Sequence, residues 1–228
     1  MPAPVPAGGN PSVRSAFVSG ARLTGWAERF GASHGGYRLQ DDDDGLRLVA
    51  ADGTVALLQA PWPADGRPGR GSGPLARLAA LASQPRRLGL LLVRRGGYGI
   101  GIVSEGTLLA SKAGTRYVQS RTAAGGQSQQ RFARRRSNQA EALVAAVAGQ
   151  AADVFGREAF EYLVPGGDRA LADLVLQEVA LRDYSRLPRL AWLDVAEPRA
   201  AVLKKAAADA CSIRVTVTDA SVQRTAQA

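Results

Sequence analysis

Apolar and polar positions in the first quarter of the chain predict a helix followed by three strands. Over residues 13–30 the apolar side chains recur at roughly helical spacing, and Gly31 follows as a C-terminal stop. Three short apolar runs come next, and Asp52-Gly53 between the last two is a hairpin signal. The predicted strands are 37–40, 46–50 and 55–58. We therefore expect an N-terminal helix plus β-meander.

The second half alternates strands and helices after a run without polar positions. The run Leu88–Val93 is typical of a strand that is buried on both faces. Further strands are predicted at 98–103, 107–110, 115–120, 160–164, 190–195 and 212–218. Helices are predicted from about 128 to 155, from 168 to 181 and from 197 to 210. The first of these carries one apolar stripe, formed by Leu143, Val144, Val147, Ala151, Val154 and Phe155.

A segment rich in Pro and Gly at 61–74, followed by a short helix at 75–84, separates the two halves. The predicted organisation is a disordered tail at 1–12, the N-terminal unit at 13–60, the linker and short helix at 61–87, a larger domain at 88–219 and a disordered tail at 220–228. The fold class is α/β, or α+β overall, with a mixed β-sheet and flanking helices.

Composition adds a strong basic excess to this picture. The chain has 228 residues, 46% of them apolar, and a formal net charge of +9. The apolar content is enough for a globular core, and the charge favours a polyanionic partner such as nucleic acid. A genome-wide preference for Arg, Ala and Gly accounts for part of the charge. No apolar run reaches the 18 or so residues needed to cross a bilayer, so we expect no membrane association.

Few residues offer catalytic chemistry of their own. The single histidine, His34, lies in a Gly-flanked turn, and the single cysteine, Cys211, lies at a helix-to-strand junction where a small buried side chain is expected. One cysteine allows no intrachain disulfide, which fits a cytoplasmic location. The acidic run Asp41–Asp44 is typical of a solvated turn. We therefore expect no metal site and no cofactor.

A basic constellation surrounds two glycines and a glutamine. Gly125, Gly126 and Gln127 lie in a predicted loop at 121–130, and glycines allow a backbone to approach another surface closely. Seven basic residues lie between positions 112 and 136, and no acid occurs between 106 and 140. In a helix that begins near Ser128, positions 131, 134 and 135 share a face on which arginines can hold phosphates. A solvated basic face is the alternative interpretation of this cluster alone.

This segment closely resembles the catalytic loop of eukaryotic and archaeal class-one peptide-chain release factors. That family has Gly-Gly-Gln-Ser, two variable residues and then Arg-Phe-x-Arg-x-Arg, which this chain matches from Gly125 to Arg136. A weaker similarity to the middle domain of those factors covers about residues 88–219. The whole chain resembles more closely the bacterial, largely actinobacterial, branch of the Vms-like release-factor family, whose members are described as peptidyl-tRNA hydrolases. The segment Gly25-Trp26-x-x-Arg29-Phe30, with His34-Gly35 after it, supports that branch.

The resemblance implies the roles of the site residues. Gln127, with Gly125 and Gly126, would act in the peptidyl-transferase centre, and Gln129 is a second candidate because related members shift the glutamine. The residues expected to contact RNA are Arg121, Ser128, Gln129, Arg131, Arg134, Arg135 and Arg136. The family's basic run before the glycines is reduced here to Arg121, and residues 1–85 show no stop-codon-reading motif. Release that is independent of a stop codon is therefore expected.

Three functions remain open from the sequence. The first is hydrolysis of peptidyl-tRNA on a stalled large ribosomal subunit, with rRNA and peptidyl-tRNA as partners and a monomeric protein. The second is cleavage of the 3′ end of the tRNA by the same docked protein. The third is a non-catalytic ribosome- or RNA-binding module. A membrane-surface protein is disfavoured, because the basic cluster lacks an adjacent apolar helix face that is free to insert.

Overall fold

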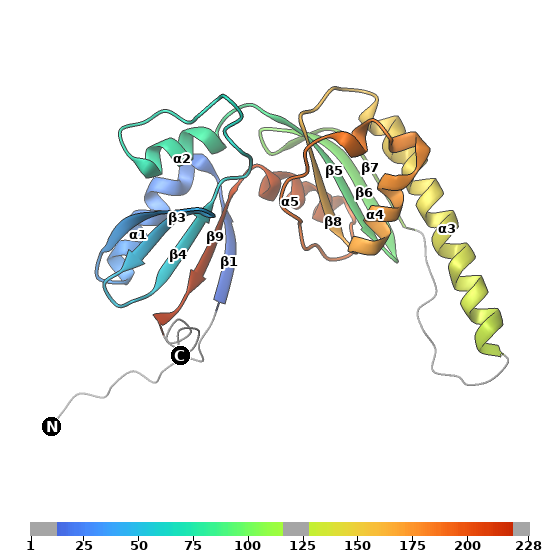
Figure 1. Cartoon of the computed structure of the whole chain (residues 1–228), viewed down its shortest axis with the longest axis horizontal. Coiled ribbons are helices and arrows are strands. Elements are labelled where there is room, and N and C mark those ends of the chain that lie inside the picture. Colours follow the sequence, from blue (N-terminus) through green and yellow to red (C-terminus); the bar gives the residue numbers. More distant parts are fainter. Residues whose placement is uncertain (1–12, 116–127, 221–228) are drawn as a thin grey trace. The chain divides into compact units, whose positions relative to one another are not determined.

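The computed structural model describes residues 13–115 and 128–220, and it describes residues 128–140 in their backbone alone. The chain forms two compact units (Figure 1). Unit 1 combines Met1–Ser83 with Ser212–Ala228, and unit 2 is Gln84–Cys211. The chain thus leaves unit 1, folds unit 2 and returns to complete unit 1.

Unit 1 contains a five-stranded antiparallel sheet in the order β1-β9-β4-β3-β2. The strands are β1 (Val13–Val18), β2 (Tyr37–Asp42), β3 (Gly45–Ala50), β4 (Val55–Gln59) and β9 (Ile213–Thr218). The predicted meander forms as β2, β3 and β4. At its second turn Asp52 accepts a hydrogen bond from the backbone N–H of Thr54 at 2.8 Å, and Gly53 adopts a φ of +85°. The sequence signal for a hairpin is confirmed at this turn.

The helices of unit 1 pack against one face of this sheet. A 3₁₀ turn (Gly20–Arg22) leads into α1 (Leu23–Ser33), and α2 (Pro74–Ala82) starts with proline, which helices tolerate at their first position. Their apolar side chains join strand residues in one buried cluster. Its members are Leu23, Ala27, Phe30, Leu46, Leu48, Ala50, Ala56, Leu58, Ala82, Ile213 and Val215.

The start of the described chain differs from its prediction. Residues 13–18 form the strand β1, whereas the sequence predicted that a helix covers 13–30. The register joins Val13 to Thr218 and Val18 to Ile213, so the partner strand is about two hundred residues away in sequence. Local spacing cannot reveal such a partner, and cross-strand pairing overrides the weak helical spacing of this segment.

Unit 2 contains a four-stranded mixed sheet in the order β7-β6-β5-β8. The strands are β5 (Arg87–Arg94), β6 (Gly97–Ser104), β7 (Thr107–Thr115) and β8 (Tyr162–Gly167). Strands β5 and β8 are parallel, and the other pairs are antiparallel. The two sheets with their flanking helices agree with the predicted α/β class.

Helices cover both faces of this sheet, which explains the continuous apolar run in β5. On one face α3 (Ser128–Phe155) and α4 (Arg169–Gln177) share a buried cluster with β5 and β6. On the other face α5 (Ala200–Ala210) approaches β6, where a Cβ built on Gly99 would lie 3.3 Å from Leu203. Asp168 caps α4 as predicted and accepts a hydrogen bond from the Leu171 N–H at 3.2 Å.

Four predictions for the second half differ from the structure. The strand predicted at 107–110 and the start of the one predicted at 115–120 form one strand, β7, because β6 pairs with it from Ser104 to Gly97, with one register shift between Ile102 and Val103. Segment 190–195 makes only an isolated bridge to β8, since Pro165 of β8 has no N–H for a regular ladder. Helix α4 ends at Gln177, and a 3₁₀ turn takes its place at 179–181. Strand β9 belongs to the sheet of unit 1, although the sequence placed it with residues 88–219.

Candidate functional site

Helix α3 is the element that leads away from the core of unit 2 toward the predicted catalytic segment. Its C-terminal part, from Leu143 to Phe155, supplies the buried apolar stripe that the sequence predicted. The helix continues N-terminally to Ser128, which lies fifteen residues before Leu143, or about 22 Å along the axis. Figure 1 shows this N-terminal part running past the sheet of unit 2.

The predicted catalytic residues come directly before α3. Gly125, Gly126 and Gln127 lie outside the described residues, as does Arg121. The helix begins at Ser128, so the last three residues of the loop predicted at 121–130 belong to the helix instead. The chain therefore places Gln127 next to a helix N-terminus, where backbone N–H groups lack partners within the helix.

Apart from Arg121, the predicted RNA-binding residues lie in the first turns of α3. The backbone of residues 128–136 is helical, and the side chains of this stretch lie outside the described residues. Because an α-helix has about 3.6 residues per turn, positions 131, 134, 135 and 138 follow one face of it. Among the side chains that the structure describes, the apolar stripe that anchors α3 starts at position 143. The helix thus combines an anchored C-terminal part with a basic N-terminal part.

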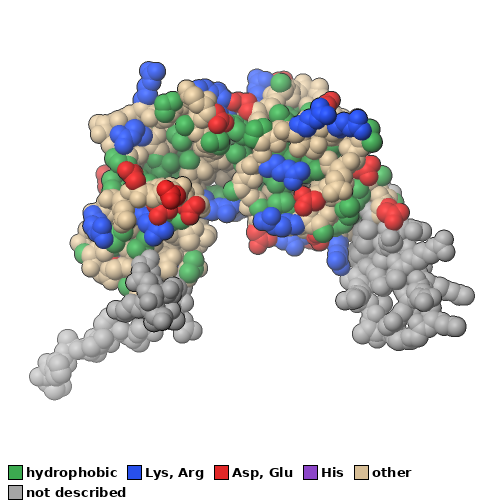
Figure 2. Space-filling view, in the orientation of Figure 1, with side chains coloured by type: hydrophobic (Ala, Val, Ile, Leu, Met, Phe, Trp, Pro, Cys, Tyr) green, Lys and Arg blue, Asp and Glu red, His purple; other side chains and the backbone are tan. Residues whose placement is uncertain are grey.

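On the face of the molecule that Figure 2 shows, the basic residues are dispersed rather than gathered. Figure 2 shows Lys and Arg side chains over the visible face of both units, mixed with acidic and apolar ones. Several of them are paired, for example Arg87 with Glu158 at 2.8 Å and Arg189 with Asp173 at 3.1 Å. The four arginines between positions 131 and 136 have no acidic residue near them in sequence. They are a better candidate for a polyanion-binding site than the dispersed basic residues.

His34 has a structural partner rather than a catalytic one. Its Nδ1 donates a hydrogen bond to Asp52 at 2.7 Å, because a carboxylate only accepts, and its ring packs on Phe30 with centroids 4.7 Å apart. The hydrogen bond from His34 holds the pKa of Asp52 below its ordinary value, and the N–H of Thr54 lowers it further. This histidine is the C-cap residue of α1, as its predicted turn position indicated.

The single cysteine is buried and not activated. Cys211 is 9% exposed at the C-terminal end of α5. Burial raises the pKa of its thiol to about 11, so very little thiolate is present at neutral pH. The expectation of a small buried side chain is confirmed. Within the ranges that the structure describes, no group of three or more His, Cys, Asp or Glu side chains could hold a metal ion.

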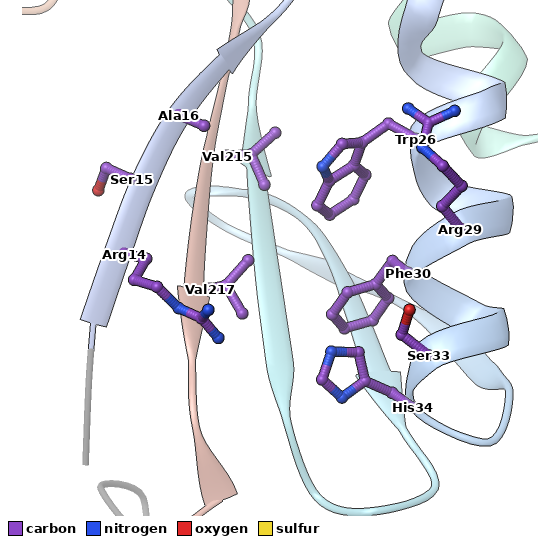
Figure 3. A pocket seen from close by; sticks show the side chains of 10 residues that line it. All are labelled: Arg14, Ser15, Ala16, Trp26, Arg29, Phe30, Ser33, His34, Val215 and Val217. Carbon is purple, nitrogen blue, oxygen red and sulfur yellow. The ribbon is translucent and has the colours of Figure 1, made fainter. Parts of the chain in front are cut away.

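Unit 1 contains a pocket that sequence reasoning missed. A cavity of about 310 Å³ lies between α1 and the strands β1 and β9 (Figure 3). It is lined by Arg14, Ser15, Ala16, Trp26, Arg29, Phe30, Ser33, His34, Val215 and Val217. The antiparallel pairing of β1 with β9 brings the first and last of these residues together. Only the motif Gly25-Trp26-x-x-Arg29-Phe30 marked part of this region in the sequence.

Sequence reasoning also missed a buried arginine at the start of unit 2. The side chain of Arg86 is fully buried, and its Nη1 donates a hydrogen bond to the Tyr162 hydroxyl at 2.6 Å. Its Nε donates to the Gln84 side chain at 3.1 Å, and Glu161 lies 3.7 Å away. These partners satisfy a buried charge and join the strands β5 and β8 at one end, so this arginine has a structural role.

Within the described chain, helices that are long and apolar enough to cross a membrane do not occur. Comparison with known proteins yields one family, described as the Actinobacteria/chloroflexi VLRF1 release factors, whose model matches residues 86–216. No curated protein matches the chain. Among solved structures, one described as the Vms1 mitochondrial localization core is 13% identical with a TM-score of 0.42, and the match covers 87% of this chain and 84% of that one.

Proposed function

Because the chain belongs to the Actinobacteria/chloroflexi VLRF1 release-factor family, we propose that it is a peptidyl-tRNA hydrolase of ribosome rescue. It acts in the cytoplasm as a monomer, docks on a large ribosomal subunit that carries peptidyl-tRNA, and frees the nascent peptide without a stop codon. The observation that carries this proposal is the Gly-Gly-Gln segment directly before α3, a helix whose far end is packed in the core of unit 2.

The reaction is hydrolysis of the ester between the peptide and the tRNA. The oxygen of a water molecule bonds to the carbonyl carbon, the bond from that carbon to the tRNA oxygen breaks, and that oxygen takes a proton from the water to become the tRNA hydroxyl. Gln127 positions this water with its side-chain amide, and Gly125 and Gly126 allow the backbone to come close. Positioning and exclusion of solvent can lower such a barrier by about 7–11 kcal/mol in the best cases without an ionisable side chain.

The arginines of α3 hold the helix against RNA. Arg131, Arg134 and Arg135 follow one helical face, and each guanidinium can bind a phosphate through two hydrogen bonds. Arg121, Ser128, Gln129 and Arg136 complete the RNA contact. Contacts to phosphates orient a protein without reading a sequence, which suits release that does not depend on a codon.

The proposal is tested with purified large subunits that carry a labelled peptidyl-tRNA. Wild type, Gln127→Ala and Gln129→Ala are compared with a matched control, Gln150→Ala, which changes a half-buried glutamine farther along α3. We expect Gln127→Ala to lose release and Gln150→Ala to retain it. Full activity of Gln127→Ala would overturn the catalytic assignment, and loss in Gln129→Ala alone would transfer the role to that residue.

The same reactions distinguish hydrolysis from cleavage of the tRNA. On a gel that resolves the 3′ end, hydrolysis leaves intact tRNA and free peptide. A tRNA shortened at its 3′ end would show nuclease action instead. A chain that binds subunits and yields neither product would be a non-catalytic binding module.

Binding is tested by replacing Arg131, Arg134 and Arg135 together with glutamine. We expect the variant to bind the large subunit more weakly. A plot of the logarithm of its binding constant against the logarithm of the salt concentration should also be less steep, by about 0.7–0.9 for each phosphate that the variant no longer binds. The control is Arg157→Gln, which removes an exposed arginine just beyond the end of α3. Equal slopes for the triple variant and the control would exclude a role of these arginines in phosphate binding.

A further inference from the structure

The pocket of unit 1 combines a row of aromatic rings with two cationic side chains. Trp26, Phe30 and His34 are four residues apart, so they follow one face of α1 and its C-cap. Figure 3 shows their rings in succession, opposite Val215 and Val217 of β9. All the described residues that line this pocket belong to unit 1. A ligand here would therefore serve a purpose beyond the proposed release reaction.

The aromatic rings support one another and leave the indole partly open. Trp26 and Phe30 are stacked with centroids 5.4 Å apart and planes 15° apart, while Phe30 contacts His34 at 4.7 Å. Phe30 is 7% exposed, so it belongs to the core, whereas Trp26 is half-buried and borders the cavity. The hydrogen bond from His34 to Asp52 fixes the third ring. The indole is thus a supported apolar surface on which another flat ring can stack.

The cations lie on opposite sides of the cavity. Arg29 projects from α1, and within the described part of the chain it makes no ion pair and no side-chain hydrogen bond. Arg14 projects from β1 and pairs with Asp219 at 3.2 Å, with 65% of the arginine side chain exposed. Exposed pairs of this kind contribute little stability, so a phosphate can replace the carboxylate at small cost.

A flat stacking surface beside two cations matches one class of ligand best. Single-stranded nucleic acid is bound by aromatic side chains under the bases and by basic groups along the backbone. The volume of about 310 Å³ lies at the lower end of the range for pockets that hold small molecules. The described residues of the lining include two arginines and no carboxylate, which favours an anionic ligand over a neutral peptide or lipid.

We propose that this pocket binds one unstacked nucleotide of single-stranded RNA. The base stacks on Trp26, and the phosphates beside it pair with Arg29 and Arg14. Because every base has a flat face, such a site accepts different sequences. The cavity thereby gives unit 1 an RNA contact that is independent of the contacts proposed for α3.

The indole N–H signals of the protein test this proposal at the pocket itself. The chain has three tryptophans, and the other two serve as internal references. Trp62 is buried and donates its N–H to the Leu81 carbonyl at 3.0 Å, and Trp192 lies in unit 2 with Arg169 over its ring. A ten-nucleotide oligouridylate is titrated into the full-length chain with Arg131, Arg134 and Arg135 replaced by glutamine. We expect the Trp26 signal to shift and the Trp62 signal to stay.

Two pocket variants and one control give the affinities. Arg29→Gln should weaken oligouridylate binding and lower the logarithmic salt slope by about 0.7 for one phosphate on a single strand. Trp26→Leu should weaken binding about fivefold or more, because the base can no longer stack on an indole. Circular dichroism reports whether the second variant still folds, and Arg29→Gln decides the question if it does not. Arg22→Gln, an exposed arginine at the start of the same helix that does not line the cavity, should bind like the parent.

Three outcomes would overturn the proposal: an unmoved Trp26 signal, equal affinities for Arg29→Gln and Arg22→Gln, or a Trp26 shift caused by a glutamate-rich decapeptide and not by RNA. Failure of the release assay leaves this test unaffected, because the titration uses neither ribosomes nor the arginines of α3. Conversely, a pocket that binds no oligouridylate would leave the catalytic role of Gln127 standing.

Discussion

The proposal that α3 sets the position of the catalytic segment leads to a prediction about helix length. Seven residues, Glu-Ala-Ala-Ala-Lys-Ala-Ala, are inserted between Ala140 and Glu141. This site lies just before Leu143, where the buried stripe of α3 begins, so the residues that pack in the core keep their contacts. The inserted residues are strong helix formers and extend the helix without interrupting it.

Helix geometry gives the size of the perturbation. Seven residues add about 10 Å along the axis and about 700° of rotation, which is about 20° short of two full turns. The arginine face therefore keeps its direction while Gln127 is displaced by about two helical turns. Since a misplacement of about 1 Å can cost about 100-fold in rate, we expect release to fall by at least about 100-fold.

The assay measures single-turnover release from peptidyl-tRNA on purified large subunits, together with thermal unfolding of the variant. The control carries the same seven residues after Gly66, in an exposed turn of unit 1 where a built Cβ meets no neighbour within 4 Å. We expect the control to release peptide like wild type and both proteins to unfold near the wild-type temperature. Wild-type release by the α3 insertion would refute the reasoning that this helix determines where Gln127 acts.

Three further predictions concern packing and ionisation. Gly89→Ala should lower the free energy of unfolding in urea by about 1–3 kcal/mol, because the new Cβ would lie 2.4 Å from the Phe160 ring; an unchanged midpoint would show that the ring moves freely. Cys211, whose buried thiol has a pKa raised to about 11, should react with iodoacetamide at pH 8 only as fast as the protein opens; rapid labelling of the native protein would contradict this. Asp52→Asn should destabilise the protein at pH 5, because a carboxyl group with a lowered pKa stabilises the fold at pH values above its ordinary pKa of 3.8. The difference in stability from wild type should vanish as the pH falls through the lowered pKa. A constant difference from pH 5 to 2.5 would exclude the ionised carboxylate as its source.

Local pattern predicted the elements whose partners are close in sequence. The runs at 88–93 and 98–103 lie within β5 and β6, which pair across a tight turn, and the meander of unit 1 is of the same kind. The apolar stripe from position 143 predicted the buried face of α3 because a helix and its periodicity are both local.

Long-range partners explain most of what the sequence did not predict. Within the described sheet, strand β1 lies at the edge beside β9. The alternation of apolar and polar residues in β9 is equally compatible with either sheet, so the sequence predicts this strand in the wrong half of the chain. The pocket of unit 1 depends on the same pairing, so Arg14 could not be associated with Trp26 from spacing alone. The catalytic segment behaves differently: Gln127 was identified by motif, lies outside the described residues, and stays a prediction.

Because the chain returns into unit 1 after Cys211, two covalent connections join the two units instead of a single linker. Strand β9 lies between β1 and β4 in the sheet, and Ile213 and Val215 contribute to the core that α1 and α2 cover. A chain that ended at Cys211 would therefore lack an inner strand of unit 1, and β1 would be left without its partner in the described sheet. The family match, which runs from residue 86 to 216, covers unit 2 except its first two residues and ends inside this strand. The region that matches the release-factor family therefore cannot be cut away from unit 1 at the C-terminal end of the match. The last strand of that region, β9, is also an inner strand of the sheet of unit 1.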